Sequence, residues 1–124
     1  MKTVTVQRKQ KFASAWMPYW LITGISKKDF MNRLGLEGDL CTHTIMGQPV
    51  SRIDISILDT IGTRIENGKT VELTLGDDVR TIFASSMDGS LSNEVILQDA
   101  DTQHLTLTTK GGFKTVNYPY FEQE

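Results

Sequence analysis

Cysteine is almost absent from this sequence, because Cys41 is the only one among 124 residues. A single cysteine cannot close an internal disulfide, which excludes the cross-linked scaffolds of small extracellular domains. No apolar run approaches the roughly 20 residues that a membrane-spanning helix needs. The basic residues near the start are not followed by the apolar stretch of a signal peptide. We therefore expect a cytoplasmic protein without a membrane segment.

An excess of positive charge is also missing. The formal net charge is -2 and the isoelectric point is about 5.7, which argues against nucleic acid as a partner. The charges are unevenly distributed, however, because the first 33 residues hold seven basic and one acidic residue, and the rest hold six basic and 14 acidic residues. Arg8, Lys9 and Lys11 are therefore candidates for a positive face that meets an acidic partner or a second copy. The alternative is ordinary scatter of charge over a solvated surface.

The central part of the chain shows the alternation of β-strands. Apolar and polar residues alternate over Ile53–Ile57, Val71–Leu75 and Val79–Phe83, which gives each run one face for a core and one for water. Turn-forming residues separate the runs, including Asn67-Gly68 and Gly76-Asp77-Asp78. We predict that these runs pair as an antiparallel meander.

Two further strands are predicted before this region. Val4 and Val6 alternate with polar neighbours in Thr3–Arg8. The aromatic and β-branched residues of Trp16–Thr23 favour a second strand. Because Pro18 cannot donate a hydrogen bond to a neighbouring strand, we expect this strand at a sheet edge or at a bulge.

One short helix is predicted over Lys27–Leu34. Ser26 is a suitable N-cap and Asp29 follows three residues later, as in a variant of the capping box. Ile25 and Phe30 have the spacing of a hydrophobic staple. The helix is too short to be stable alone, so it must pack on the sheet.

Strands are also expected over Glu94–Gln98, Gln103–Thr109 and Phe113–Asn117. About eight short strands separated by turns indicate a single domain, an antiparallel β-sandwich with one short helix, over residues 1–124. The segment at about 26–50 forms a helix-and-loop insertion. An OB-like small barrel is the alternative fold, because one helix between strands fits that fold too.

Few residues have a pattern that would support chemistry. Cys41 and His43 lie two apart, so in a strand they would share a face as a possible nucleophile and base. Asp99, Asp101 and His104 gather at a turn and are the candidates for a metal site. In both cases an ordinary structural role is the alternative, namely a buried cysteine beside an exposed histidine and solvated acids in a turn. We expect no cofactor, since no phosphate-binding or dinucleotide-binding glycine motif is present.

Aromatic residues gather near the two ends of the chain. In strand geometry Trp16 and Trp20 share one face and Tyr19 points to the other, so one of these side chains is a candidate for the surface. Exposed aromatic side chains suit sugar stacking or a protein interface. The alternative is that both clusters close the ends of one core.

Two segments together resemble a loose group of small uncharacterised all-β proteins of low-GC Gram-positive bacteria. The resemblance covers about two thirds of the chain, and the segment from Ser26 to Val50 has no counterpart in it. It implies a β-sandwich and transfers no catalytic residue. The positions that carry the resemblance are Arg8, Lys9, Pro18, Tyr19, Gly62, Asn67, Gly68, Ser92 and Asn93.

These observations favour a non-catalytic binding domain, with a protein as the expected partner. Unpaired strands at the sheet edges could also join two copies of the chain. Two alternatives stay open. One is a carbohydrate-binding module that uses Trp16, Tyr19 and Trp20, and the other is an enzyme that uses Cys41 and His43.

Overall fold

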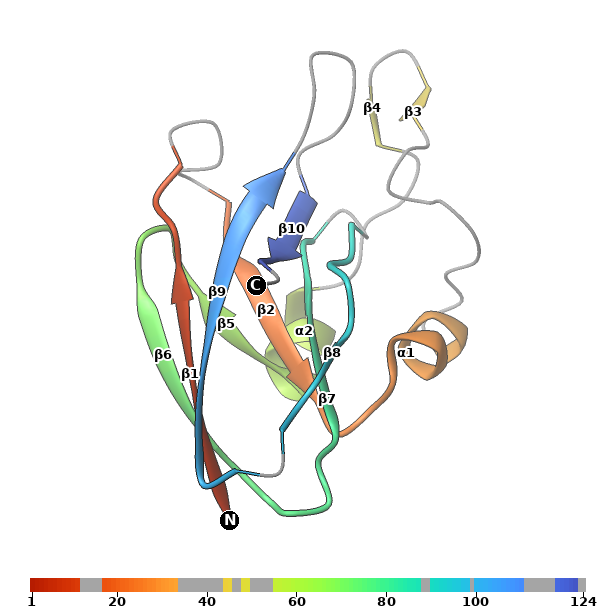
Figure 1. The fold of residues 1–124 in the computed structure, drawn as a ribbon. Coiled ribbons are helices and arrows are strands. Elements are labelled where there is room, and N and C mark those ends of the chain that lie inside the picture. Colours follow the sequence, from red (N-terminus) through yellow and green to blue (C-terminus); the bar gives the residue numbers. More distant parts are fainter. Residues whose placement is uncertain are drawn as a thin grey trace.

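The computed structural model describes residues 1–11, 17–33, 44–45, 48–49, 55–87, 90–98, 100–110 and 118–122. Two four-stranded sheets pack face to face, which confirms the predicted β-sandwich (Figure 1). Eight of the ten described strands form these two separate sheets and no closed barrel, so the OB-like alternative is not the fold. The elements are β1 (Lys2–Arg8), β2 (Tyr19–Thr23), α1 (Lys27–Arg33), β3 (Thr44–Ile45), β4 (Gln48–Pro49), α2 (Ile55–Ile61), β5 (Gly62–Ile65), β6 (Thr70–Leu75), β7 (Thr81–Ser85), β8 (Val95–Ile96), β9 (Thr102–Lys110) and β10 (Tyr118–Phe121).

The strand order differs from the predicted meander. One sheet has the order β10-β9-β1-β6 and the other has the order β5-β2-β7-β8, while β3 and β4 form a small hairpin. The meander prediction was wrong because β5, β6 and β7 do not pair with each other. β5 and β7 both pair with β2, whereas β6 pairs with β1. The chain therefore crosses between the two sheets before and after β6.

The first sheet also contains one parallel pair. β1 runs parallel to β9, although these strands lie about 100 residues apart in the sequence. The other pairs in both sheets are antiparallel. β1 thus lies in the middle of its sheet, between β9 and β6.

The main core lies between the two sheets. β1 contributes Val4 and Val6, and the facing sheet contributes Leu21 and Ile82; the four side chains are at most 1% exposed. Burial of such apolar surface is the main stabilising contribution to a domain of this size.

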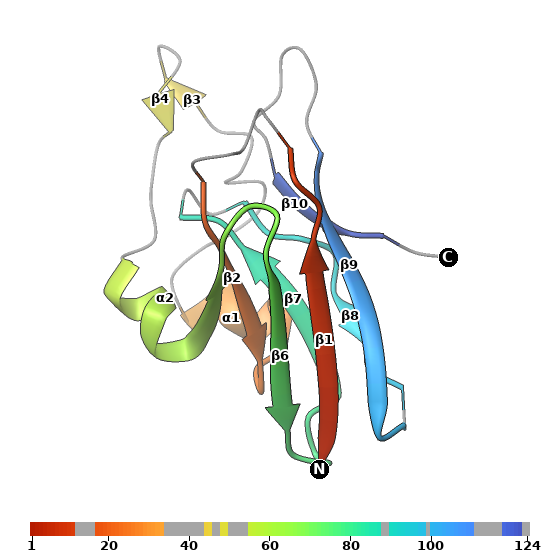
Figure 2. The same cartoon turned by 90° about the vertical axis from the view of Figure 1, so that its left-hand side faces the viewer.

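A second core lies on the outer face of the sheet that contains β2. Trp20, Phe30, Leu58 and Phe83 are fully buried there, with the rings of Phe30 and Phe83 in an edge-to-face contact at 5.2 Å between centroids. Phe30 belongs to α1 and Leu58 to α2, so both helices cover this face. Figure 2 shows α2 on the side of β2 that faces away from β1 and β6.

α1 begins as the sequence predicts. The Asp29 amide donates to Ser26 Oγ at 3.1 Å, and the Phe30 amide donates to the Ser26 carbonyl at 2.8 Å. These bonds confirm Ser26 as the N-cap. Ile25 packs beside Phe30 in the second core, as the predicted hydrophobic staple requires.

α2 replaces a predicted strand. The described part of the run Ile53–Ile57 is helical from Ile55, so the strand prediction was wrong there. Leu58 and Ile61 lie three residues apart on one helix face, and both belong to or pack against the second core. Burial of this face decides the structure, because three alternating isoleucines are compatible with either a strand or a helix.

β2 is an inner strand and not the predicted edge strand. It pairs with β5 on one side and with β7 on the other. Pro18 lies directly before Tyr19, the first paired residue, so its missing N–H removes no hydrogen bond from the sheet.

Candidate functional site

Arg8 cannot contribute to the predicted basic face, because its side chain is part of the interior. Its side chain is 1% exposed, and Nη1 donates a 2.9 Å hydrogen bond to the Ile65 carbonyl in the opposite sheet. Its guanidinium lies 4.0 Å from the centre of the Tyr19 ring, which is a cation–π distance. Burial lowers the pKa of the guanidinium, and nearby Tyr19 and Glu66 offset part of that effect. Arg8 therefore connects the two sheets from inside.

The other two basic candidates lie at the surface. Lys9 forms an ion pair with Glu122 at 2.6 Å, and half of its side chain is exposed. Lys11 is exposed, and its backbone amide donates to the side chain of Asn67 at 3.0 Å. The ion pair accounts for Lys9, and the contact with the turn at Asn67 accounts for Lys11. Neither lysine shares a site with Arg8.

The aromatic candidates that the structure describes belong to the core. Tyr19 and Trp20 are fully buried, so neither ring is exposed for stacking on a sugar. The Tyr19 hydroxyl lies 2.8 Å from Thr109 Oγ1 across the sandwich, and Trp20 Nε1 donates to Asp59 Oδ1 at 2.7 Å. Both faces of β2 are covered, one by the first sheet and the other by the helices. Trp16 lies outside the described residues.

The remaining chemical candidates are only partly described. Cys41, His43 and Asp99 lie outside the described residues. Asp101 and His104 are exposed. Within the part of the chain that the structure describes, no three side chains of histidine, cysteine, aspartate or glutamate are grouped as metal ligands.

Several positions of the bacterial all-β resemblance have structural roles here. Gly68 has a φ of 73° in the turn before β6, a conformation that favours glycine. A Cβ on Gly62 would lie 3.1 Å from the Leu21 carbonyl, so a side chain there would crowd the backbone of β2. Ser92 Oγ accepts a 2.7 Å hydrogen bond from the buried Ala84 amide. These positions specify turns and strand contacts.

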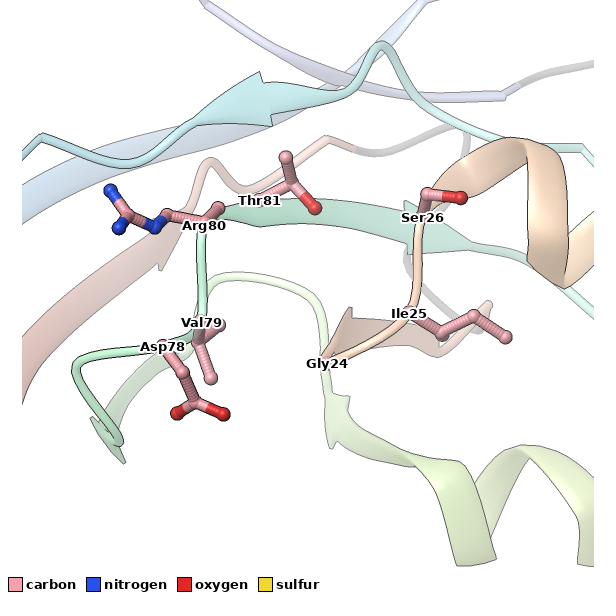
Figure 3. A pocket seen from close by; sticks show the side chains of 7 residues that line it. All are labelled: Gly24, Ile25, Ser26, Asp78, Val79, Arg80 and Thr81. Carbon is pink, nitrogen blue, oxygen red and sulfur yellow. The ribbon is translucent and has the colours of Figure 1, made fainter.

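A small hollow of about 210 Å³ lies where the loop before α1 meets the start of β7 (Figure 3). Asp78 and Arg80 contribute its charged side chains. Figure 3 shows them pointing in different directions, with Arg80 extending away from Ser26. Ser26 Oγ already accepts the capping hydrogen bond of α1. The hollow therefore lacks convergent polar groups.

A larger groove of about 820 Å³ lies between β8 and β9. These strands follow one another in the chain but belong to different sheets, so the groove lies between the two sheets. Ile96 on β8 is 79% exposed and points to the outer side of its sheet, because its neighbour Val95 faces the main core. The residues that line the groove are Glu94, Val95, Ile96, Gln98, Thr102, Gln103, His104, Leu105, Thr106 and Glu122.

β9 pairs with β1 along one edge, and its other edge faces away from β1 along this groove. The amides of Thr3 and Lys9 on β1 donate to the carbonyls of Asp101 and Leu107, both at 2.8 Å. The backbone groups of successive residues in a strand point to opposite sides. The odd-numbered residues of β9 are therefore bonded to β1, and the even-numbered residues present their N–H and C=O groups to the other side.

β10 covers only the second half of that edge. It pairs with β9 from Leu107 to Lys110, and the Glu122 amide extends the contact to the Thr106 carbonyl at 2.9 Å. The N–H and C=O groups of Thr102 and His104 have no hydrogen-bond partner among the described residues. Such a short unpaired edge is a template for one more strand.

Comparison with family models, curated proteins and solved structures finds no significant match to this chain. The resemblance to small bacterial all-β proteins therefore stays a prediction. Within the described ranges, neither helix has the length and apolar character needed to cross a membrane.

Sequence reasoning missed the groove. The sequence suggested Asp101 and His104 as possible metal ligands. The distinguishing feature of this segment is the outward-facing backbone of β9 and not these side chains. The exposure of Ile96 could not be predicted, because this residue lies in the continuous apolar run Val95–Leu97, which fits a strand buried on both faces. The groove becomes visible only when β8 and β9 are known to belong to different sheets, because it lies between them.

Proposed function

We propose that this chain is a non-catalytic protein-binding domain, and that the groove between β8 and β9 takes an extended segment of the partner protein. The proposal depends chiefly on the backbone of Thr102 and His104, which has no partner among the residues that the structure describes. A bound segment would add a strand to the first sheet beside β9, in line with β10. Backbone hydrogen bonds supply the affinity in this mode of recognition, and side-chain contacts supply the specificity.

The apolar lining supports the same proposal. Val95 is partly buried against the main core, and Ile96 beside it is almost fully exposed. A strand added to β9 would place alternate side chains toward the side of β8 that carries Val95, whereas Ile96 points to the opposite side of its sheet. Burial of one large apolar side chain stabilises a complex by about 1.5–3 kcal/mol before the costs of association.

A cytoplasmic location, expected from the sequence, is part of this proposal. Two alternatives receive less support. The burial of Tyr19 and Trp20 disfavours a sugar-binding surface at β2. Cys41 and His43 lie outside the described residues, so an enzyme that uses them stays a prediction.

Proline substitution tests the proposal directly. His104→Pro removes an outward N–H that β1 does not use and fills its place with a ring, so the fold should persist while the edge is blocked. Thr74→Pro is the matched control. Thr74 also points its backbone outward, but on β6 at the opposite edge of the same sheet. His104→Thr separates the role of the imidazole from that of the backbone.

The assay is selection of random nine-residue peptides on phage against the immobilised chain. We expect peptides that bind the unchanged chain and Thr74→Pro, and that bind His104→Pro at least tenfold more weakly, which corresponds to about 1.4 kcal/mol. Circular dichroism checks that each variant is folded. Selected peptides that bind all variants equally, or the absence of any selected peptide, would contradict the proposal.

A further inference from the structure

The main core reaches the surface between β8 and β9. Val95 on β8 and Leu105 on β9 pack against this core, and both side chains are only partly buried. Both residues line the groove of about 820 Å³. Their neighbours Ile96 and His104 point to the outer faces of the two sheets, because side chains alternate along a strand. The groove therefore gives access to the space between the sheets, beside the outward-facing edge of β9.

Two side-chain contacts limit the length of this groove. At one end Asn93 Nδ2 donates to the Phe121 carbonyl at 3.0 Å, and the Phe121 amide donates to Asn93 Oδ1 at 2.8 Å. At the other end the Gln98 amide donates to Gln103 Oε1 at 2.9 Å. The two sheets are thus joined before and after Val95, and an inserted side chain has room only between these contacts.

Within the described ranges, the edge of β9 offers an added strand one inward-facing position. The Thr106 carbonyl already accepts a hydrogen bond from the Glu122 amide at 2.9 Å, so the open part of the edge is Thr102–His104. Residues that lie opposite each other on neighbouring strands have their side chains on the same face of the sheet. Gln103 pairs with the buried Val4 and so belongs to the inner face. The residue opposite Gln103 would therefore point between the sheets, and its two neighbours would point outward.

We propose that the segment bound in this groove is anchored by one apolar side chain, at the residue opposite Gln103, which enters the space between the sheets against Val95 and Leu105. This inference deepens the proposed function and rests on it. The residues before and after the anchor lie beside Thr102 and His104, whose side chains are exposed, so polar side chains suit these two positions. The partner segment is thus an extended stretch with a single apolar residue between polar ones.

Three synthetic peptides test the chemistry and the number of the anchors. The first has the sequence Lys-Thr-Thr-Val-Thr-Thr-Lys, which reads the same from either end and so does not depend on strand direction. The second has serine in place of the valine. The third, Lys-Thr-Val-Thr-Val-Thr-Lys, has two valines that would lie on the same side of a strand. Binding of fluorescein-labelled peptides up to 1 mM is measured by fluorescence anisotropy in 50 mM NaCl.

We expect the one-valine peptide to bind at least about tenfold more tightly than the serine peptide, because valine gains from burial whereas a buried hydroxyl loses its hydrogen bonds to water. The two-valine peptide should bind only about twofold more tightly than the one-valine peptide, because either valine can serve as the anchor but the second finds no inward position.

Two neighbouring residues of β8 supply matched variants of the chain. Val95→Thr places a hydroxyl on the inner side, against the anchor, and should reduce the preference for valine over serine by about threefold or more. Ile96→Thr makes a similar change on the opposite side of the sheet and should leave this preference unchanged. Circular dichroism checks that both variants are folded.

The outcomes distinguish this inference from the proposed function. If the one-valine and serine peptides bind equally, and His104→Pro weakens both, the anchor is wrong and the edge still binds a strand. If the two-valine peptide binds tenfold or more tightly than the one-valine peptide, or if Ile96→Thr changes the preference as much as Val95→Thr does, the single inward position is wrong. If no peptide binds in a way that depends on His104→Pro, both the proposed function and this inference are wrong.

Discussion

Replacement of Arg8 should destabilise the fold and should not act as a change of surface charge. The guanidinium donates a hydrogen bond to the Ile65 carbonyl and stacks on Tyr19, in a side chain that is 1% exposed. A hydrogen bond to a charged group contributes about 1.5–3 kcal/mol, and a desolvated cation–π contact about 2 kcal/mol. Arg8→Ala also leaves a cavity between the sheets. We expect it to cost about 3–5 kcal/mol, a large part of the stability of an ordinary domain.

Arg8→Met tests which part of the side chain matters. It keeps most of the apolar stem and removes the cost of burying a charge, but it leaves the Ile65 carbonyl without this donor. The expected cost is about 1–3 kcal/mol, clearly less than that of Arg8→Ala. Lys9→Ala is the surface control, because its exposed ion pair with Glu122 contributes at most about 1 kcal/mol.

The assay is urea denaturation followed by tryptophan fluorescence, since Trp20 is fully buried in the folded chain. The free energy of unfolding and the slope against urea are compared for the unchanged chain and the three variants. If Arg8→Ala loses no more stability than Lys9→Ala, then Arg8 does not connect the sheets and the reasoning is refuted. Arg8 should accordingly be left unchanged in any test of surface charge.

Three further predictions follow from single contacts. Trp20→Phe removes the hydrogen bond to Asp59 and part of the second core, so urea denaturation should show a loss of about 1–3 kcal/mol; a loss below 0.5 kcal/mol would contradict that role. Glu72 lies in the middle of the exposed edge of β6, where antiparallel pairing of two copies would bring it opposite itself. Glu72→Thr should therefore increase self-association in analytical ultracentrifugation, whereas Glu66→Thr should not; equal sedimentation of both variants would exclude this pairing. The N-terminal ammonium lies 2.9 Å from the Asp77 carboxylate and lowers the pKa of that group. Because the folded pKa is lowered, the contact stabilises the fold above the ordinary pKa of about 4 and is lost as the pH falls through the lower folded value. Carbon-13 NMR should show this lowered pKa, and an unshifted titration would mean that the ion pair does not form in solution.

Local patterns in the sequence predicted much of the fold. β1, β6 and β9 alternate in polarity as strands with one buried face do, and the turn at Asn67-Gly68 has the residues that its backbone requires. The cap of α1 was also predictable, because it depends on residues three or four positions apart. These features are specified within a few residues of the chain.

The features that failed depend on contacts between distant segments. Ile53–Ile57 fits a strand until α2 is seen to bury Leu58 and Ile61 on the outer face of β2. Tyr19 and Trp20 point to opposite sides, as the alternation predicted, but helices cover the second side and bury Trp20 as well. From the sequence alone, Arg8 is expected at the surface. In the fold, its guanidinium contacts the Ile65 carbonyl and the Tyr19 ring of the other sheet.

The candidate site could not be predicted for the same reason. Its main feature is a stretch of backbone that has no neighbouring strand among the described residues. The sequence of β9 does not indicate which side β1 occupies or where the pairing with β10 falls. Within the described ranges, the parallel pairing of β1 with β9 and the short overlap with β10 together leave Thr102 and His104 unpaired.

Amide hydrogen exchange at β9 tests the central claim most directly, measured by NMR on the chain alone and with a peptide selected for binding. In the chain alone, we predict fast exchange for the amides of Thr102 and His104 and protection for those of Gln103 and Leu105, which face β1. The peptide should slow exchange at Thr102 and His104 by at least tenfold and leave Glu72 on β6 unchanged. Protection of Thr102 and His104 before any peptide is added, or no change at them when the peptide binds, would contradict the account.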